Sequence, residues 1–109
     1  IGAAVIKDRK IMSNDGIIVV IANIDINKKQ ILGHINITTR GFVQVNENEE
    51  LLKELEQVSR RAINSKLNGP INYSDIKNEI ITNLSSYTYE KTGRKPIILP
   101  VIMDIKKNS

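Results

Sequence analysis

The chain has 109 residues, a length that suits one domain with a single modest hydrophobic core. It contains no cysteine, which excludes a disulfide framework and a thiolate metal site and fits a cytoplasmic protein. A net charge of +4 favours anionic partners such as RNA, but only mildly, because many domains without such partners are equally basic.

The first residues differ in pattern from the rest of the chain. The sequence begins at Ile1, shows no signal-peptide pattern, and reaches a turn signal at Ser13–Gly16. We therefore expect residues 1–16 to be a leading segment that follows an upstream domain absent from this chain. Residues 17–109 are expected to form a single domain.

Two alternating stretches predict an antiparallel β-hairpin. In residues 17–26 the even positions stay apolar, so the even face should be the core face. Residues 27–30 form the turn, and in the return strand, residues 31–39, the odd positions are the apolar ones. His34, the single histidine, falls on the polar face and is expected to be a surface residue.

The alternation breaks at Arg40-Gly41-Phe42. Glycine inside a strand pattern is typical of a bulge or of a close backbone approach. We expect Arg40 and Gly41 to hold such a feature rather than a catalytic site.

Two amphipathic helices follow. The first is predicted over residues 47–67, with Asn46 and Glu49 as a capping box, and it stops at residues 68–70. The second is capped by Asn72 and frays near Thr92 and Gly93. Its predicted buried stripe comprises Tyr73, Ile76, Ile80, Leu84 and Tyr87.

Residues 96–105 form the last apolar stretch and predict a strand rich in branched residues. Odd and even positions are both apolar, so we expect cover on both faces. Pro100 has no N–H to give to a ladder and points to a sheet edge or a bulge. The predicted fold class is α+β: a small mixed sheet, made of the N-terminal antiparallel hairpin and this strand, with two helices packed on one face.

Two helices can cover only one face of that sheet. The other face would be left with apolar residues, and the interface candidates are Ile17, Val19, Ile21, Ile98 and Ile102. We expect a second protomer or an absent catalytic body to cover them. Cover by residues 1–6 is the alternative.

Composition and spacing predict no catalytic chemistry. One histidine cannot supply a hydrolytic metal site, no serine lies in a nucleophile motif, and the six glycines form no phosphate-binding loop. We therefore predict no catalytic residue, no metal ligand, no cofactor and no membrane-spanning segment. The basic candidates for RNA contact are Arg40, Lys91, Arg94 and Lys95.

Three stretches carry a family resemblance: residues 7–16, Thr39-Arg40-Gly41-Phe42-Val43, and residues 89–100, which read YEKTGRKPIILP. Together they resemble the C-terminal domain of bacterial ribonuclease J, a metallo-β-lactamase and β-CASP nuclease. The resemblance implies a cytoplasmic parent enzyme that processes and degrades RNA as a 5′-to-3′ exonuclease and endonuclease.

In that family the zinc ions lie in a catalytic body outside this chain, so no catalytic residue carries over. The resemblance implies that the domain supports a homo-oligomer or a hetero-oligomer of paralogues. Thr39 and Gly93 depart from the family pattern and indicate a divergent paralogue. Two alternatives stay open: a module that contacts RNA through its basic residues, and an unrelated α+β domain that binds another protein.

Overall fold

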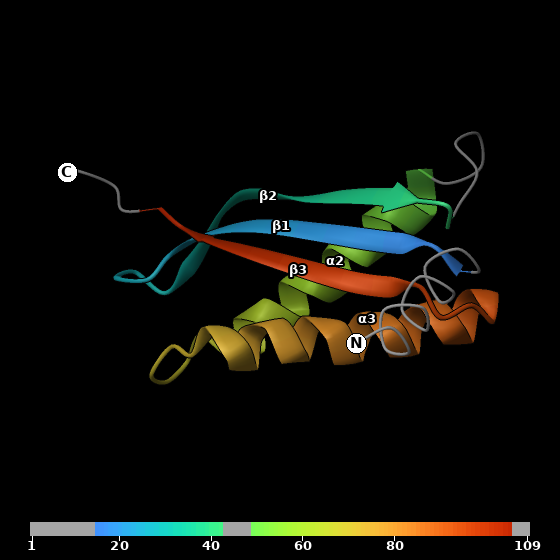
Figure 1. The fold of residues 1–109 in the computed structure, drawn as a ribbon. Helices are drawn as coiled ribbons and strands as arrows, with labels where there is room; N and C mark the ends of the chain where they lie inside the picture. The colour runs from blue at the N-terminus through green and yellow to red at the C-terminus, as the bar shows by residue number, and fades with distance from the viewer. Residues whose placement is uncertain (1–14, 43–48, 106–109) are drawn as a thin grey trace, which may run out of the picture.

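A computed structural model describes residues 15–42 and 49–105 of the chain (Figure 1). These residues form three strands and two helices in the order strand, strand, helix, helix, strand. The elements are β1 (Ile17–Asp25), β2 (Gln30–Arg40), α2 (Glu49–Ser65), α3 (Tyr73–Thr92) and β3 (Ile97–Asp104). The predicted hairpin, helices and final strand are all present.

The sheet has the order β2-β1-β3. β1 pairs antiparallel with β2 and parallel with β3, so the sheet is mixed, as predicted. The even residues of β1 are fully buried, which confirms the core face expected from the alternation: Ile18, Val20, Ala22 and Ile24. β3 lies at an edge of the sheet, the position that Pro100 indicated.

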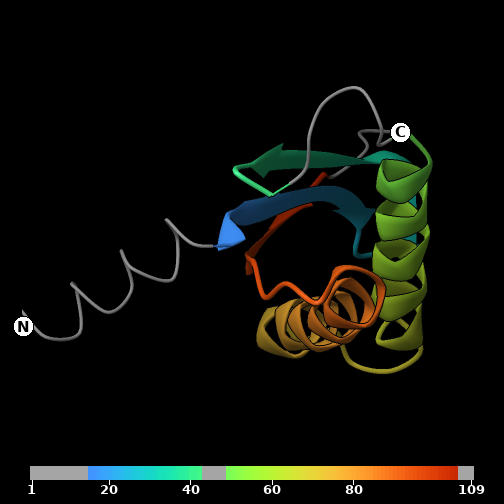
Figure 2. The ribbon, with the colours of Figure 1, turned by 90° about the vertical axis from the view of Figure 1, so that its right-hand side faces the viewer.

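Both helices lie on the same side of the sheet (Figure 2). α2 packs against β2 and α3 packs against β3, and the two helices also contact each other. The buried residues of α2 include Leu55, Val58, Ala62 and Ile63, as its periodicity predicted. The result is a two-layer α+β fold with one hydrophobic core between sheet and helices.

The ends of α3 follow the predicted capping. The Asn72 side chain accepts a hydrogen bond of 3.1 Å from the backbone N–H of Asp75. Gly93 ends the helix in the left-handed region and donates its N–H to the Tyr89 carbonyl at 2.8 Å. Tyr73, expected in the buried stripe, is 38% exposed because it is the first residue of the helix, a turn before the buried Ile76.

The irregularity in the hairpin is not where the sequence placed it. The register shifts between Ile21 and Asn23 of β1, opposite residues 33–35 of β2. Two extra residues enter β2 there, which keeps the odd positions on the core face before and after the shift. Gly33 has a φ of 67° at this bulge. Gly41 lies just beyond the end of β2, so of the two features expected there, a bulge or a close backbone approach, the bulge lies elsewhere.

The prediction of a tight backbone at Gly41 is confirmed. Gly41 has a φ of 68°, and the neighbouring Gly16 has a φ of 86°. A Cβ on Gly16 would overlap the Arg40 carbonyl and the Gly41 backbone, so glycine is required at the start of β1. The close approach joins the end of β2 to the start of β1.

Three expectations fall on residues outside the described ranges. These are the leading segment up to residue 14, the capping residue Asn46, and the possible cover of the sheet by residues 1–6.

Candidate interaction surfaces

The sheet face turned away from the helices is apolar over its two neighbouring strands. We call it the outer sheet face and define it by Ile17, Val19, Ile21, Leu99, Val101 and Met103. The parallel register sets Val19 beside Leu99 and Ile21 beside Val101. Leu99 is 45% exposed, Val101 41% and Met103 47%. Side chains from two strands therefore form a continuous apolar surface as far as Ile21 and Val101, and Met103 extends it beside the polar Asn23.

The outer sheet face has a polar margin on the β2 side. Thr38 pairs with Val19 and Asn36 pairs with Ile21, so uncharged polar residues line most of that border, and Arg40, which pairs with Ile17, adds a charge at its end. On the other side the surface reaches the free edge of β3. The apolar surface thus occupies the centre and one edge of the sheet.

Five residues were predicted as interface candidates, and the structure divides them between the two faces. Ile17, Val19 and Ile21 lie on the outer sheet face and are partly exposed. Ile98 is buried at 6% exposure, and Ile102 packs against the core, so both face the helices. Within the described residues, Leu99, Val101 and Met103 of β3 are exposed, so the expected cover of this face by a second protomer or a catalytic body stays a prediction.

The sequence missed Leu99, Val101 and Met103 as surface residues. Residues 97–103 are apolar at every position except Pro100, so no alternation assigns a face. The face is decided by the register with β1, in which Pro100 lies beside the buried Val20 and the odd residues of β3 therefore face outward. A single sequence does not reveal this pairing.

The free edge of β3 is interrupted by proline. The N–H groups of Ile97 and Ile105 donate to the carbonyls of Gly16 and Ile24 across β1, at 2.9 and 3.0 Å. Since backbone groups alternate in direction along a strand, the even residues of β3 direct theirs to the free edge. Pro100 is one of these even residues, so its missing N–H falls on the free edge rather than in the ladder.

The four predicted basic residues make different contacts. Arg94 donates a guanidinium hydrogen bond to the Phe42 carbonyl, so it holds the segment after β2. The Lys91 ammonium lies 5.9 Å from the Tyr87 ring centroid, and that of Lys95 lies 5.2 Å from the Tyr89 ring centroid. Tyr87 and Tyr89 are two residues apart on α3 and so point in different directions. The two lysines therefore lie over different faces of the helix.

Arg40 lies two residues before Phe42, the residue whose carbonyl accepts the Arg94 guanidinium hydrogen bond. It is the last residue of β2 and pairs with Ile17, at the end of the outer sheet face.

Lys91 lies over the ring of Tyr87. Burial raises the pKa of Tyr87 to about 12, and the Glu54 carboxylate adds to this shift. The phenol beneath Lys91 therefore stays neutral at physiological pH.

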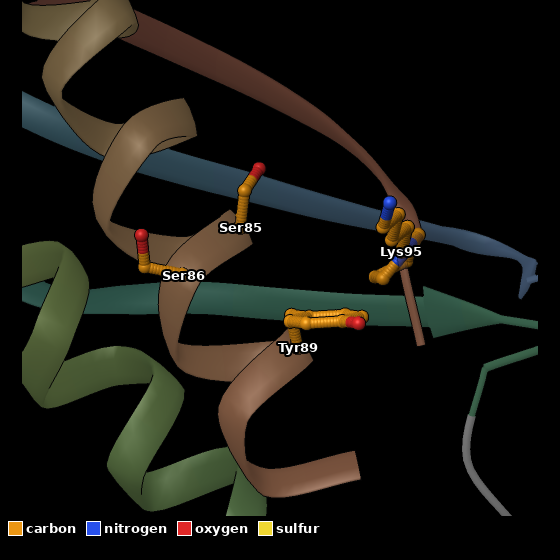
Figure 3. A pocket seen from close by; sticks show the side chains of 5 residues that line it. Ser85, Ser86, Tyr89 and Lys95 are labelled. Carbon is orange, nitrogen blue, oxygen red and sulfur yellow. The ribbon is translucent and has the colours of Figure 1, made fainter. Parts of the chain in front are cut away.

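A pocket of about 350 Å³ lies where the last turns of α3 meet the start of β3 (Figure 3). We call it the Tyr89 pocket; its lining is Ser85, Ser86, Tyr89, Lys95 and Pro96. The sequence singled out Lys95 but not the tyrosine or the serines. Their spacing of three and four residues on one helix brings them to one side of α3.

Within residues 15–42 and 49–105, no three histidine, aspartate or glutamate side chains lie close enough to hold a metal ion. In the same ranges, neither helix has the length and apolar character needed to cross a membrane.

His34 lies on the polar face of β2, as predicted. Its side chain is 93% exposed and lies 3.6 Å from the Glu56 carboxylate.

Comparison with known proteins gives a consistent family. Ribonuclease J 1 of Streptococcus pyogenes is 36% identical over 109 residues, which are 99% of this chain and 20% of that protein. Ribonuclease J2 of Bacillus subtilis is 36% identical over 106 residues, which are 96% of this chain and 19% of that protein. Ribonuclease J 2 of Staphylococcus epidermidis is 37% identical, with the same coverage of 96% and 19%.

The chain therefore spans about a fifth of the length of these curated relatives. The sequence profile of the family described as "Ribonuclease J C-terminal domain" matches residues 4–105, which is almost the whole chain. The resemblance seen in the sequence is confirmed, and the chain belongs to the ribonuclease J C-terminal domain family.

Proposed function

We propose that the chain is a non-catalytic domain of a cytoplasmic, ribonuclease J-like enzyme, and that it supports oligomerisation of the nuclease. Family membership supports the link to ribonuclease J. The activity itself, zinc-dependent exonuclease and endonuclease cleavage of RNA, is proposed for the parent protein, with zinc held outside this chain. Membership also disfavours the alternative of a binding domain unrelated to ribonucleases.

The observation that carries the oligomerisation proposal is the outer sheet face. Its β3 residues are 41–47% exposed; Leu99 and Val101 lie beside the apolar Val19 and Ile21 of β1, and Met103 lies beside Asn23. Contiguous apolar surfaces on soluble domains are typical of sites where another protein docks. Docking removes these side chains from water, which is the main favourable contribution to association.

The charge distribution favours a second copy as the partner. The chain carries a net charge of +4, yet among the residues of the outer sheet face and its β2 margin only Arg40 is charged, and it lies at the end of the face, where it pairs with Ile17. A surface that packs on a copy of itself meets its own charges across the two-fold axis, so a surface whose single charge lies at its end limits repulsion. A paralogue with an equivalent face would satisfy the same condition.

The test is a charge placed at the centre of the surface. Val101→Lys puts an ammonium on the outer sheet face at an exposed position of an edge strand, so the fold should be retained. We expect the 109-residue chain without substitutions, the parent of these variants, to sediment as a dimer at micromolar concentration. The variant should sediment as a monomer, because dimerisation would bury its new charge.

The matched control is Ile81→Lys, the same kind of exchange at an exposed apolar residue of α3, away from the outer sheet face. It should leave the dimer intact. A parent chain that remains monomeric at millimolar concentration, or a Val101→Lys variant that dimerises like the parent, would contradict the assembly role.

A further inference from the structure

The Tyr89 pocket presents an aromatic ring to solvent on a fixed backbone. Tyr89 is 55% exposed, more than Tyr73 at 38%. Its carbonyl accepts the N–H of Gly93, the residue that caps α3, so the ring projects from an anchored helix end. An exposed ring held in this way offers a flat surface for stacking.

Lys95, whose ammonium lies above this ring, is held in place through its backbone but not through its side chain. The Lys95 N–H donates to the Asp15 carboxylate at 2.9 Å, and the buried Pro96 follows. The Lys95 ammonium lies 5.2 Å from the centre of the Tyr89 ring, at the end of a flexible four-carbon stem. It can therefore leave the ring without any change in the backbone.

The charge around the pocket favours an anionic ligand. Among the residues that line the pocket, Lys95 is the charged one; the Asp15 carboxylate, which accepts the Lys95 N–H, is not part of the lining. Glu90 follows Tyr89 but projects about 100° further round the helix. The ammonium of Lys95 is thus the charge that faces the ring (Figure 3).

The volume and lining limit what the pocket can hold. About 350 Å³ is at the small end of sites for organic ligands and suits one flat ring with its substituents. The exposed serines, Ser85 and Ser86, bring hydroxyls that can both donate and accept, so they can meet several kinds of polar edge. A proline-rich peptide would need a groove lined by several aromatic rings, and Tyr89 is the one ring in this lining.

We propose that the Tyr89 pocket binds one nucleotide of single-stranded RNA, with the base stacked on Tyr89 and the adjacent phosphate paired with Lys95. The base replaces the ammonium above the ring, because base stacking is worth more than an exposed cation–π contact. The hydroxyls of Ser85 and Ser86 then meet the ribose or the base edge. This site goes beyond the assembly role and uses a different surface.

The experiment measures binding of a short, fluorescein-labelled oligoadenylate to the 109-residue chain by fluorescence anisotropy at several salt concentrations. Tyr89→Leu keeps apolar bulk but removes the aromatic face, and we expect binding to weaken roughly tenfold or more. Tyr89→Phe keeps the face and should bind like the parent. Lys95→Gln should reduce the slope of log affinity against log salt by about one, as expected for one lost phosphate contact.

Matched controls lie elsewhere on α3. Tyr73→Leu removes an exposed tyrosine at the other end of the helix, and Lys77→Gln removes an exposed lysine; neither should change binding. The proposal is overturned if the parent chain does not bind the oligonucleotide, or if Tyr89→Leu binds as tightly as Tyr89→Phe. Sedimentation of Tyr89→Leu as the parent's oligomer would show that a loss of RNA binding is separate from assembly.

Discussion

Gly16 is the residue on which the start of the sheet depends. Its Cα faces the backbone of Arg40 and Gly41, and its carbonyl accepts the N–H of Ile97 at 2.9 Å. One residue without a side chain thus lies between the end of β2 and the start of β3. Two separate constraints act on it: a positive φ and the absence of room for a Cβ.

Replacing Gly16 with alanine should therefore cost more stability than the backbone conformation alone explains. We expect the free energy of unfolding to fall by about 2 kcal/mol or more, because strain at positive φ adds to steric overlap with backbone atoms. Urea denaturation measures this change. Gly41→Ala is the control, because it has a similar φ but its Cβ would meet the Gly16 Cα at 3.6 Å, an ordinary contact. Equal losses in the two variants would contradict the role of the close approach.

At the scale of elements, α2 holds the bulge of β2 in place. The Glu56 carboxylate accepts the N–H of Ile35 at 3.2 Å, and the Arg60 guanidinium donates to the Gly33 carbonyl at 2.9 Å. These are backbone groups at the bulge, where the ladder with β1 is interrupted. The two side chains, 3.5 Å apart on successive turns, satisfy groups that a regular hairpin would pair internally.

Removing the carboxylate should destabilise the domain through this bulge. For Glu56→Ala we expect a loss of about 1–2 kcal/mol, because the Ile35 N–H loses its partner in a partly buried site. Chemical denaturation gives the value. Glu56→Gln keeps an acceptor oxygen and should lose less than half as much. If the two variants are equally stable, the hydrogen bond does not support the bulge.

Alternation predicted β1 and β2 and helical periodicity predicted α2 and α3, since each of those patterns reports one buried face, whereas β3 was predicted from its branched residues. β1 shows this most clearly, with its even residues buried from Ile18 to Ile24. β3 shows the limit: Ile98 and Leu99 are equally apolar, and only the pairing of the whole strand with β1 decides which faces water. The Tyr89 pocket was missed for a similar reason, because its residues meet only when α3 ends against the start of β3.

At the scale of the whole molecule, the outer sheet face and the free edge of β3 differ in the groups that they offer to a partner. The outer sheet face presents apolar side chains, whereas the edge beside it lacks a donor at Pro100. Proline on an edge strand discourages another strand from pairing there. The molecule therefore favours association through side chains over extension of its sheet.

Restoring the donor should remove that restriction. Pro100→Val and Pro100→Ala both supply an N–H at the free edge, and we expect both variants to form larger assemblies than the parent at equal concentration. Sedimentation velocity measures the shift. Agreement between the two variants assigns the effect to the backbone donor rather than to the new side chain. Two variants that sediment like the parent would show that Pro100 does not protect the edge.

The parallel pairing of β1 with β3 also dictates when the domain can be completed during synthesis. Asp15 and Lys95, 80 positions apart, are joined by a hydrogen bond, so the central strand leaves the ribosome long before its second neighbour. The β1–β2 hairpin can pair early, but contacts between such distant segments form late because a long loop must close. Half of the outer sheet face belongs to β3. A nascent chain therefore has no complete docking surface, and a partner that binds this surface selects only chains whose last strand has been made.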